Sequence, residues 1–228
     1  MLNSPISPRL DPRFGGRWVS AIELALGTIV VIGRNVFGIL PNEVPILVVL
    51  GLISIRVRDR GWAAIGLTRP TSWRRIIGIA AVAAALRISL GEFVIDPLTS
   101  LFWPPSKPPE GIDAIRGNAG VALLALLIVW VFAAFGEEVA YRGYLLIRAA
   151  DLGRRSPAAY WLGVVFVSVL FGYGHYYKGP AGIVDSGCAG LILGAAYLLS
   201  GRNLWCSILA HGFIDTVGVF VVFQGWDS

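Results

Sequence analysis

Seven long apolar runs, spread from Trp18 to Trp226, constrain this chain more than any other feature of its sequence. A transmembrane α-helix needs about 20 predominantly apolar residues to cross the hydrocarbon core of a bilayer. Hydrophobic residues make up 56% of the 228 residues and charged residues only 14%, so few segments are suited to water. The sequence therefore predicts an all-α, polytopic transmembrane helix bundle of about seven spans.

The apolar runs place the expected helices at 18–40, 42–56, 76–97, 118–148, 157–175, 181–200 and 203–225. The first run contains Glu23 and lacks a small-residue cleavage site, so we interpret it as a retained helix and not as a signal peptide. Residues 1–17 are then a cytoplasmic N-terminal tail, and 18–228 are expected to form a single transmembrane domain. Tryptophans lie near most span ends, as an interfacial belt requires, and only Trp130 falls clearly within a span.

Arginine is concentrated in alternate connections between these spans. Six arginines lie from Arg56 to Arg75, and Arg148, Arg154 and Arg155 follow the fourth helix. The intervening connections carry almost no basic residues beyond Lys107, Arg116 and Lys178. The positive-inside rule predicts a cytoplasmic N-terminus and an external C-terminus. Because arginine far outnumbers lysine and alanine and glycine abound, we expect a bacterial host, and thus a multi-pass protein of the plasma membrane.

Two connections are long enough to have a structure of their own. The segment 56–75 mixes arginines with Trp62 and Trp73, a composition typical of an interfacial segment lying along the headgroups between helices two and three. The segment 97–117 contains five prolines and is expected to be an extended external loop.

Neither the net charge nor the cysteines indicate a soluble partner. The net charge is +5, but the arginines lie in short loops between apolar spans, which favours anionic lipid over nucleic acid. Cys188 and Cys206 lie in or beside apolar spans without a pairing pattern, so we interpret them as small buried hydrophobic residues.

One charged cluster interrupts the fourth apolar run. Glu137, Glu138 and Arg142 follow an uncharged stretch that begins at Asn118. Three unpaired charges at a helix centre in lipid would cost roughly 8 to 10 kcal/mol, so the cluster must be paired, hydrated or functional. On a helix, Glu138 and Arg142 are separated by one turn and can pair. Glu137 points elsewhere and lacks such a partner. If Arg148 marks the membrane boundary, Glu137 lies roughly 16 Å inside it.

Both histidines of the chain also lie in apolar segments. His175 stands at the end of the fifth expected helix, and His211 lies within the seventh. Asp215 follows His211 by four residues, so the two side chains share a helix face. Groups that are each costly in lipid are best explained if they converge on one polar cavity.

These residues form three motifs in order, and the motifs resemble those of the CPBP (Abi) family, which includes the type II CAAX prenyl endopeptidases. The motifs are Glu137-Glu138-x-x-Tyr141-Arg142-Gly143, Phe171-x-x-x-His175 and His211-x-x-x-Asp215. The segment from Trp62 to Trp73 is similar to one often found ahead of the motif-bearing half in that family. The resemblance implies an intramembrane protease whose catalytic half is about 118–225.

The resemblance also implies a role for each residue. Glu137 and His175 would activate a water for attack on a peptide carbonyl, and His211 with residue 215 would stabilise the oxyanion. Glu138 and Arg142 would brace the site. A buried carboxylate without a partner suits a general base, and an oxyanion donor contributes about 10² to 10³ in rate. The implied partners are a peptide or protein substrate and the lipid bilayer, and no cofactor is expected.

Two positions depart from the family pattern. Tyr141 replaces the commoner Phe, and Asp215 stands where Asn is usual. An ionised carboxylate cannot donate a hydrogen bond to an oxyanion. We therefore hypothesise that Asp215 orients His211 or is itself protonated.

Helix lengths raise a further question about His175. Counted from the cytoplasmic ends of their helices, His175 lies roughly 10 Å or more beyond Glu137 and His211 if all the helices begin level. Helix tilt, or an earlier start of the fifth helix, must absorb this difference.

Other functions use the same residues. Glu137, His175 and His211 have the ligand types of a catalytic zinc site, although no His-Glu-x-x-His helix is present. A non-catalytic membrane scaffold, immunity or regulatory protein could retain the motifs without using them. A proton-coupled transporter could instead use the charges of the third helix, Arg87, Glu92 and Asp96. The oligomeric state does not follow from the sequence.

Overall fold

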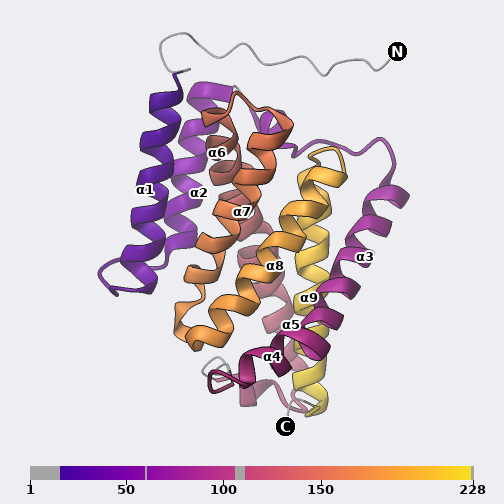
Figure 1. The fold of residues 1–228 in the computed structure, drawn as a ribbon. Helices are drawn as coiled ribbons and strands as arrows, with labels where there is room; N and C mark the ends of the chain where they lie inside the picture. Colours follow the sequence, from indigo (N-terminus) through magenta and orange to yellow (C-terminus); the bar gives the residue numbers. More distant parts are fainter. Residues whose placement is uncertain (1–15, 60, 106–110, 227–228) are drawn as a thin grey trace.

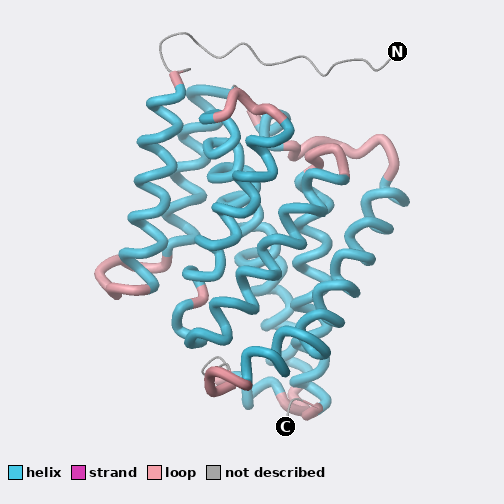
Figure 2. Tube along the Cα trace, in the orientation of Figure 1, coloured by secondary structure: helices cyan, strands magenta, loops and turns pink. Residues whose placement is uncertain are grey.

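The apolar runs fold into long helices that lie roughly side by side (Figures 1 and 2). The computed structural model describes residues 16–59, 61–105 and 111–226, and no strand occurs in these ranges. Within them, six continuous helices are long and apolar enough to cross a membrane. The remaining expected span, 42–56, corresponds to the shorter helix α2, extended by the π-helical turn η1. The predicted all-α, multi-pass membrane fold is confirmed.

The elements before the site are α1 (Arg17–Asn35), α2 (Glu43–Ser54), η1 (Ile55–Asp59), η2 (Trp62–Ile65), α3 (Trp73–Leu90), η3 (Gly91–Ile95) and α4 (Asp96–Ser100). The later elements are η4 (Ile112–Ile115), α5 (Ala119–Ile128), η5 (Val129–Glu137), η6 (Val139–Leu145), α6 (Leu146–Leu152), α7 (Pro157–Gly174), η7 (Tyr176–Lys178), α8 (Gly179–Leu199) and α9 (Leu204–Gln224). Of the η elements, η2, η4 and η7 are 3₁₀ turns, and the others are π-helical.

The predicted helix ends need two corrections. The first helix ends at Asn35, well before residue 40. The third continues through Pro97 to Ser100, because Pro97 occupies the first turn of α4, where a missing backbone N–H costs little. The segment 97–117 is thus helical at its start. Its Lys107, Pro108 and Pro109 lie outside the described residues, as does the N-terminal tail before residue 16.

The helices divide into two groups (Figure 1). Helices α1 and α2 lie against α6 and the π-helical segment η6, while α3 packs on α9, and α8 crosses between α7 and α9. The α1–α2 and α7–α8 turns end short of the level that α4 and the end of α9 reach. Because of this step, the α7–α8 turn lies above the level at which α9 ends in Figure 1.

Small residues allow α7 and α8 to pack closely. Gly182, Ser186, Gly190 and Gly194 recur every fourth residue of α8 and are the kind of stripe that brings membrane helices together. A Cβ atom on Gly190 would lie 3.0 Å from the backbone of Ser168 on α7. The contact brings the backbone of α8 within reach of side chains from the neighbouring helices.

Buried ion pairs join the helices at the end nearest the N-terminus. Arg148 is fully buried, pairs with Glu23 at 2.9 Å and Asp151 at 2.8 Å, and also contacts Asp59. Arg58 pairs with Glu23 at 2.8 Å. Arg148 was expected to mark the membrane boundary, and its guanidinium is held inside the protein by three carboxylates.

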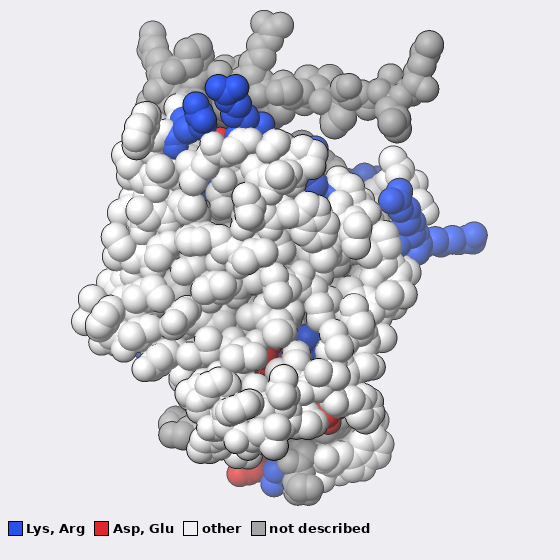
Figure 3. Space-filling view, viewed as in Figure 1, with Lys and Arg blue, Asp and Glu red and all other residues white. Residues whose placement is uncertain are grey.

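The segment 56–75 crosses the end of the bundle between α2 and α3. Trp62 and Trp73 remain largely exposed there, but Ile65 is completely buried. The carbonyl of Gly66 accepts a hydrogen bond from the amide of Leu204 at 2.9 Å, so the segment also caps the start of α9. Figure 3 shows Lys and Arg side chains near this end of the molecule, above a surface that carries few charges.

Candidate active site

Three separate helices bring the motif residues together. The π-helical stretch η5–η6 carries Glu137 and Arg142 with Glu138 between its two parts, α9 carries His211 and Asp215, and His175 caps the end of α7. π-Helical turns are rare and are frequently found at functional sites. The stretch from 129 to 145 is therefore unusual in both length and position.

Glu138 is the hub of the cluster. Its side chain is completely buried, and its Oε1 accepts hydrogen bonds from Arg142 at 2.8 Å and from Nδ1 of His211 at 2.9 Å. Arg142 also donates to the carbonyl of Gly190 at 3.0 Å, within the close α7–α8 packing. The sequence indicated the pairing of Glu138 with Arg142. It gave no sign that Glu138 also holds His211, because the spacing of residues far apart in the chain carries no such information.

The ring nitrogens of His211 face two carboxylates. Nδ1 contacts Glu138, and Nε2 lies 3.6 Å from Oδ2 of Asp215. A bond to a carboxylate oxygen requires a proton on Nδ1. A His211 ring protonated on both nitrogens is thus flanked by negative charge on each side, and its Nε2–H is the donor that forms no hydrogen bond with a described residue.

His175 has a defined tautomer when neutral. Its Nδ1 lies 2.9 Å from the carbonyl oxygen of Phe171, and a carbonyl only accepts, so Nδ1 carries the hydrogen. The lone pair is then on Nε2. The Phe171 ring contacts both histidines, with ring centroids 4.8 Å from His175 and 6.0 Å from His211. Through Phe171, His175 and His211 thus belong to one cluster of aromatic rings.

Glu137 differs from its neighbour in having no partner. Its side chain is partly buried, and its Oε2 is buried without a hydrogen bond to any described residue. It lies close enough to His211 and Asp215 to interact electrostatically with both. No hydrogen bond or ion pair among the described residues joins Glu137 directly to His175.

Glu43 is a further carboxylate near the site, and it is not among the residues that the sequence motifs selected. It lies in the first turn of α2 and is 8% exposed. A Cβ atom on Gly174 would lie 2.8 Å from the Tyr141 hydroxyl and 3.5 Å from Oε1 of Glu43. Both groups therefore converge on the residue that precedes His175. An acidic residue at the start of an apolar span was the available signal.

The charges of the third helix have a local explanation. Arg87 on α3 pairs with Asp185 on α8 at 2.6 Å. Glu92 is exposed on η3. Arg87, which the transporter hypothesis would use, thus links two helices.

No group of three or more His, Cys, Asp or Glu side chains in the described ranges is arranged to hold a metal ion. This holds for Glu137, His175 and His211, the residues of the zinc alternative. Cys206 is buried, whereas Cys188 is partly exposed, and neither forms a disulfide.

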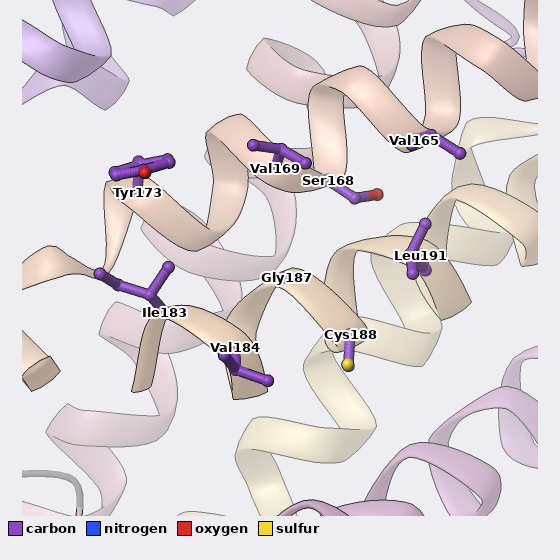
Figure 4. Close-up of a pocket in the computed structure, with 9 residues that line it drawn as sticks. All are labelled: Val165, Ser168, Val169, Tyr173, Ile183, Val184, Gly187, Cys188 and Leu191. Carbon is purple, nitrogen blue, oxygen red and sulfur yellow. The ribbon is translucent and has the colours of Figure 1, made fainter. Parts of the chain in front are cut away.

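An apolar pocket of about 250 Å³ lies between α7 and α8 (Figure 4). One wall runs along α7 from Val165 to Tyr173, and the other along α8 from Ile183 to Leu191. Tyr173 is two residues from His175. The pocket thus leads from the helix surface toward the α7–α8 turn.

The sequence of the helices that carry this site matches a known protein family. Residues 119–217 match the Rce1-like type II CAAX prenyl endopeptidase family. The resemblance that the three motifs indicated is thus confirmed for this part of the chain, and the family that it matches is one of membrane proteases. The Rce1-like region runs from α5 into α9 and contains all six motif residues discussed above, but not Glu43 or α1 to α3. Comparisons with curated proteins and with solved structures gave no match.

Proposed function

We propose that the protein is an intramembrane endopeptidase that hydrolyses a peptide bond near the membrane. The observation that supports this proposal most is the contrast between the two adjacent glutamates. Oε1 of Glu138 accepts hydrogen bonds from Arg142 and His211, and only its Oε2 is buried without one. Glu137 also has a buried Oε2 without a hydrogen bond, and it forms no ion pair or side-chain hydrogen bond with any described residue. A purely structural cluster would gain nothing from leaving a buried carboxylate unpaired, since this costs free energy.

Glu137 and His175 supply the base. A water in the cavity transfers a proton to the Glu137 carboxylate as its oxygen attacks the carbonyl carbon of the substrate. The lone pair on Nε2 of His175 accepts a hydrogen bond from the same water and holds it in place. When the C–N bond breaks, Glu137 returns the proton to the departing amine. The bond made is C–O, the bond broken is C–N, and the enzyme is unchanged.

His211 supplies the oxyanion donor. Its Nε2–H makes no hydrogen bond to a described residue and is free to donate to the substrate oxygen, while the bond from Nδ1 to Glu138 fixes the ring. Asp215 accepts from or attracts Nε2 between turnovers, at 3.6 Å, and so orients the ring without donating to the oxyanion itself. Arg142 holds Glu138 in place from the other side. In this scheme Asp215 replaces the orienting function that an amide would supply.

The substrate is a peptide or protein segment at the membrane, and the apolar pocket between α7 and α8 suits an apolar portion of it. We further propose that the protein resides in a bacterial plasma membrane with its N-terminus in the cytoplasm, because the arginine side chains gather at that end. Fusions of a compartment-sensitive reporter to each terminus test the orientation. The C-terminal fusion is expected to report the external side.

Cleavage of a reporter peptide by purified protein in lipid nanodiscs tests the proposed activity. Glu137→Gln keeps the shape of the side chain and removes the base, so we expect turnover to fall at least 10²-fold, the lower end of the range for general base catalysis. Glu92→Gln is the matched control, because it makes the same change on an exposed side chain outside the cluster. Its turnover is expected to equal that of the wild type.

Two results would contradict the endopeptidase. Equal turnover by wild type and Glu137→Gln would show that cleavage does not depend on this carboxylate. Absence of cleavage by a folded wild type across a panel of membrane-anchored peptides would favour the scaffold or regulatory alternative.

We also propose that the reaction needs no metal. Prolonged dialysis against 1,10-phenanthroline and EDTA is expected to leave turnover unchanged, because Glu137 activates water by itself in this scheme. Loss of activity that zinc restores, but that calcium does not, would support the zinc alternative instead.

A further inference from the structure

A hydrogen-bonded chain connects the helix of Glu137 to the helix of His211 outside the motif residues. The indole Nε1–H of Trp130 donates to the hydroxyl of Thr216 at 3.1 Å, and that hydroxyl donates to the carbonyl of Gly212 at 2.6 Å. Trp130 lies on η5, seven residues before Glu137, and the other two residues lie on α9. The chain therefore spans the two elements that must hold the base and the oxyanion donor in register.

The indole ring fixes the distance between the same two helices. A Cβ atom on Gly212 would lie 2.5 Å from two carbon atoms of the Trp130 ring, so the ring occupies the space of a missing side chain. The ring also meets Phe213 edge-on, with centroids 6.2 Å apart. At Gly212, directly after His211, the Trp130 ring of η5 therefore packs directly against the backbone of α9.

The positions of these contacts along α9 are informative. Gly212 and Thr216 each follow a motif residue, His211 and Asp215 respectively. Trp130 therefore fixes both turns of α9 that carry the site. An indole N–H within a span must find an acceptor, because lipid offers none, and the Thr216 hydroxyl is that acceptor here.

We propose that Trp130, acting through Thr216 and Gly212, is a positioning residue that sets the rotation of α9 and so aims His211 at the substrate. The proposal rests on the proposed endopeptidase function. Two links then define the relation between the helices: the bond from His211 to Glu138, and the Trp130 chain on the adjacent face. A rotation of α9 moves Nε2 of His211 relative to the reacting carbonyl, and a displacement of about 1 Å at such a group can cost 10²-fold in rate.

Three substitutions separate positioning from packing. Trp130→Phe removes the N–H and keeps an aromatic ring, Thr216→Val removes the hydroxyl at equal shape, and Thr216→Ser retains the hydroxyl. Because a single hydrogen bond is lost, we expect kcat to fall about three- to tenfold in the first two variants, with KM within about twofold. The double variant should be no worse than either single variant, and Thr216→Ser should retain nearly the wild-type kcat.

Trp161→Phe is the matched control, since Trp161 is 46% exposed on α7 and no described residue forms a hydrogen bond with it. It should change neither constant. The positioning role is overturned if kcat is unchanged in Trp130→Phe and Thr216→Val, if their losses multiply, or if Thr216→Ser is as impaired as Thr216→Val.

A spectroscopic readout tests the positioning without any substrate. The chain has only two histidines, so the imidazole N–H resonances of protein labelled with ¹⁵N-histidine can be assigned with a His175→Asn variant. We expect Trp130→Phe to shift the Nδ1–H resonance of His211, which reports its bond to Glu138, and Trp161→Phe to leave it in place. An unshifted resonance in Trp130→Phe would refute the positioning role, whereas a shifted resonance in a protein that cleaves nothing would refute only the proposed function.

Discussion

At the scale of single residues, the site assigns different tasks to two neighbouring glutamates. Glu138 and Glu137 are adjacent in the sequence, but their side chains leave the helix about a quarter turn apart. The Glu138 side chain accepts hydrogen bonds from Arg142 on η6 and His211 on α9. The Glu137 side chain has a buried oxygen to which no described residue donates a hydrogen bond. The difference between the residues lies in their surroundings and not in their chemistry.

This difference predicts that the same substitution, Glu to Gln, changes the stability of the protein at one of the two positions and not at the other. Glu138→Gln weakens two charge-assisted hydrogen bonds, so we expect it to lower the free energy of unfolding by about 1.5–3 kcal/mol. Glu137→Gln breaks no such bond and should leave the stability within about 0.5 kcal/mol of the wild type. Thermal unfolding in nanodiscs measures both. An equal loss in the two variants would mean that Glu137 has a structural partner after all.

The motif residues could be chosen from the sequence because charges and histidines in lipid stand out from their apolar surroundings. The i, i+4 spacing was sufficient to indicate the pairing of Glu138 with Arg142. The bond from Glu138 to His211 joins residues 73 positions apart, and its partners depend on how α9 packs against η6. The same reason explains why Glu43 was missed, because only the packing of α2 brings it near Gly174.

At the scale of helices, backbone spacing positions the site as much as side chains do. The close contact of α7 with α8 brings the Gly190 carbonyl within reach of Arg142, and the end of α7 carries His175. Apolar runs predicted where these helices lie but not the π-helical stretch η5–η6. A wider helical turn uses the same residue types as an α-helix, so the sequence pattern does not distinguish the two.

The α7–α8 contact gives a prediction at this scale. A Cβ atom on Gly172 would lie 2.6 Å from the backbone carbonyl oxygen of Ile183, and a backbone cannot move aside as a side chain can. We expect Gly172→Ala to destabilise the protein by about 1–3 kcal/mol.

The control for this prediction is Gly218→Ala on α9, where a Cβ atom would meet nothing within 4 Å. It should be neutral or slightly stabilising, because alanine has a higher helix propensity than glycine. Unfolding midpoints of the two variants decide the matter. A stable Gly172→Ala would show that the two helices can separate without cost.

At the scale of the whole molecule, the half that carries the motifs is held to the N-terminal helices by charge. Arg148 on α6 pairs with Glu23 on α1 and contacts Asp59 on η1, while Asp151 on α6 lies 3.7 Å from Arg58 on η1, and the pairs are largely buried. The sequence placed Arg148 near one end of the bundle, but nothing in its spacing indicated which carboxylates it pairs with. Opposite charges from separate helices can be matched only when the topology is known.

Removal of one member of these pairs should be severe. Arg148→Met leaves buried carboxylates without their cation, and we expect a loss of about 3–5 kcal/mol in unfolding free energy. Arg75→Met is the control, because Arg75 is exposed at the start of α3 and should change stability by less than about 0.5 kcal/mol. The loss should persist at about 1 M salt, since buried pairs are screened little. A loss that vanishes in salt would indicate that the pairs are open to solvent.

The ion pairs between α1, η1 and α6 also limit which N-terminal helices can be combined with the Rce1-like region. The Rce1-like region begins at residue 119 and thus contains Arg148 and Asp151, but not Glu23 or Asp59. A recombination that joined this region to the first two helices of another protein would leave Arg148 buried without the carboxylates of Glu23 and Asp59. The ion pairs therefore couple the two parts of the chain. We expect substitutions at Glu23, Arg58, Asp59 and Arg148 to occur together, so that each buried charge keeps a partner of opposite sign.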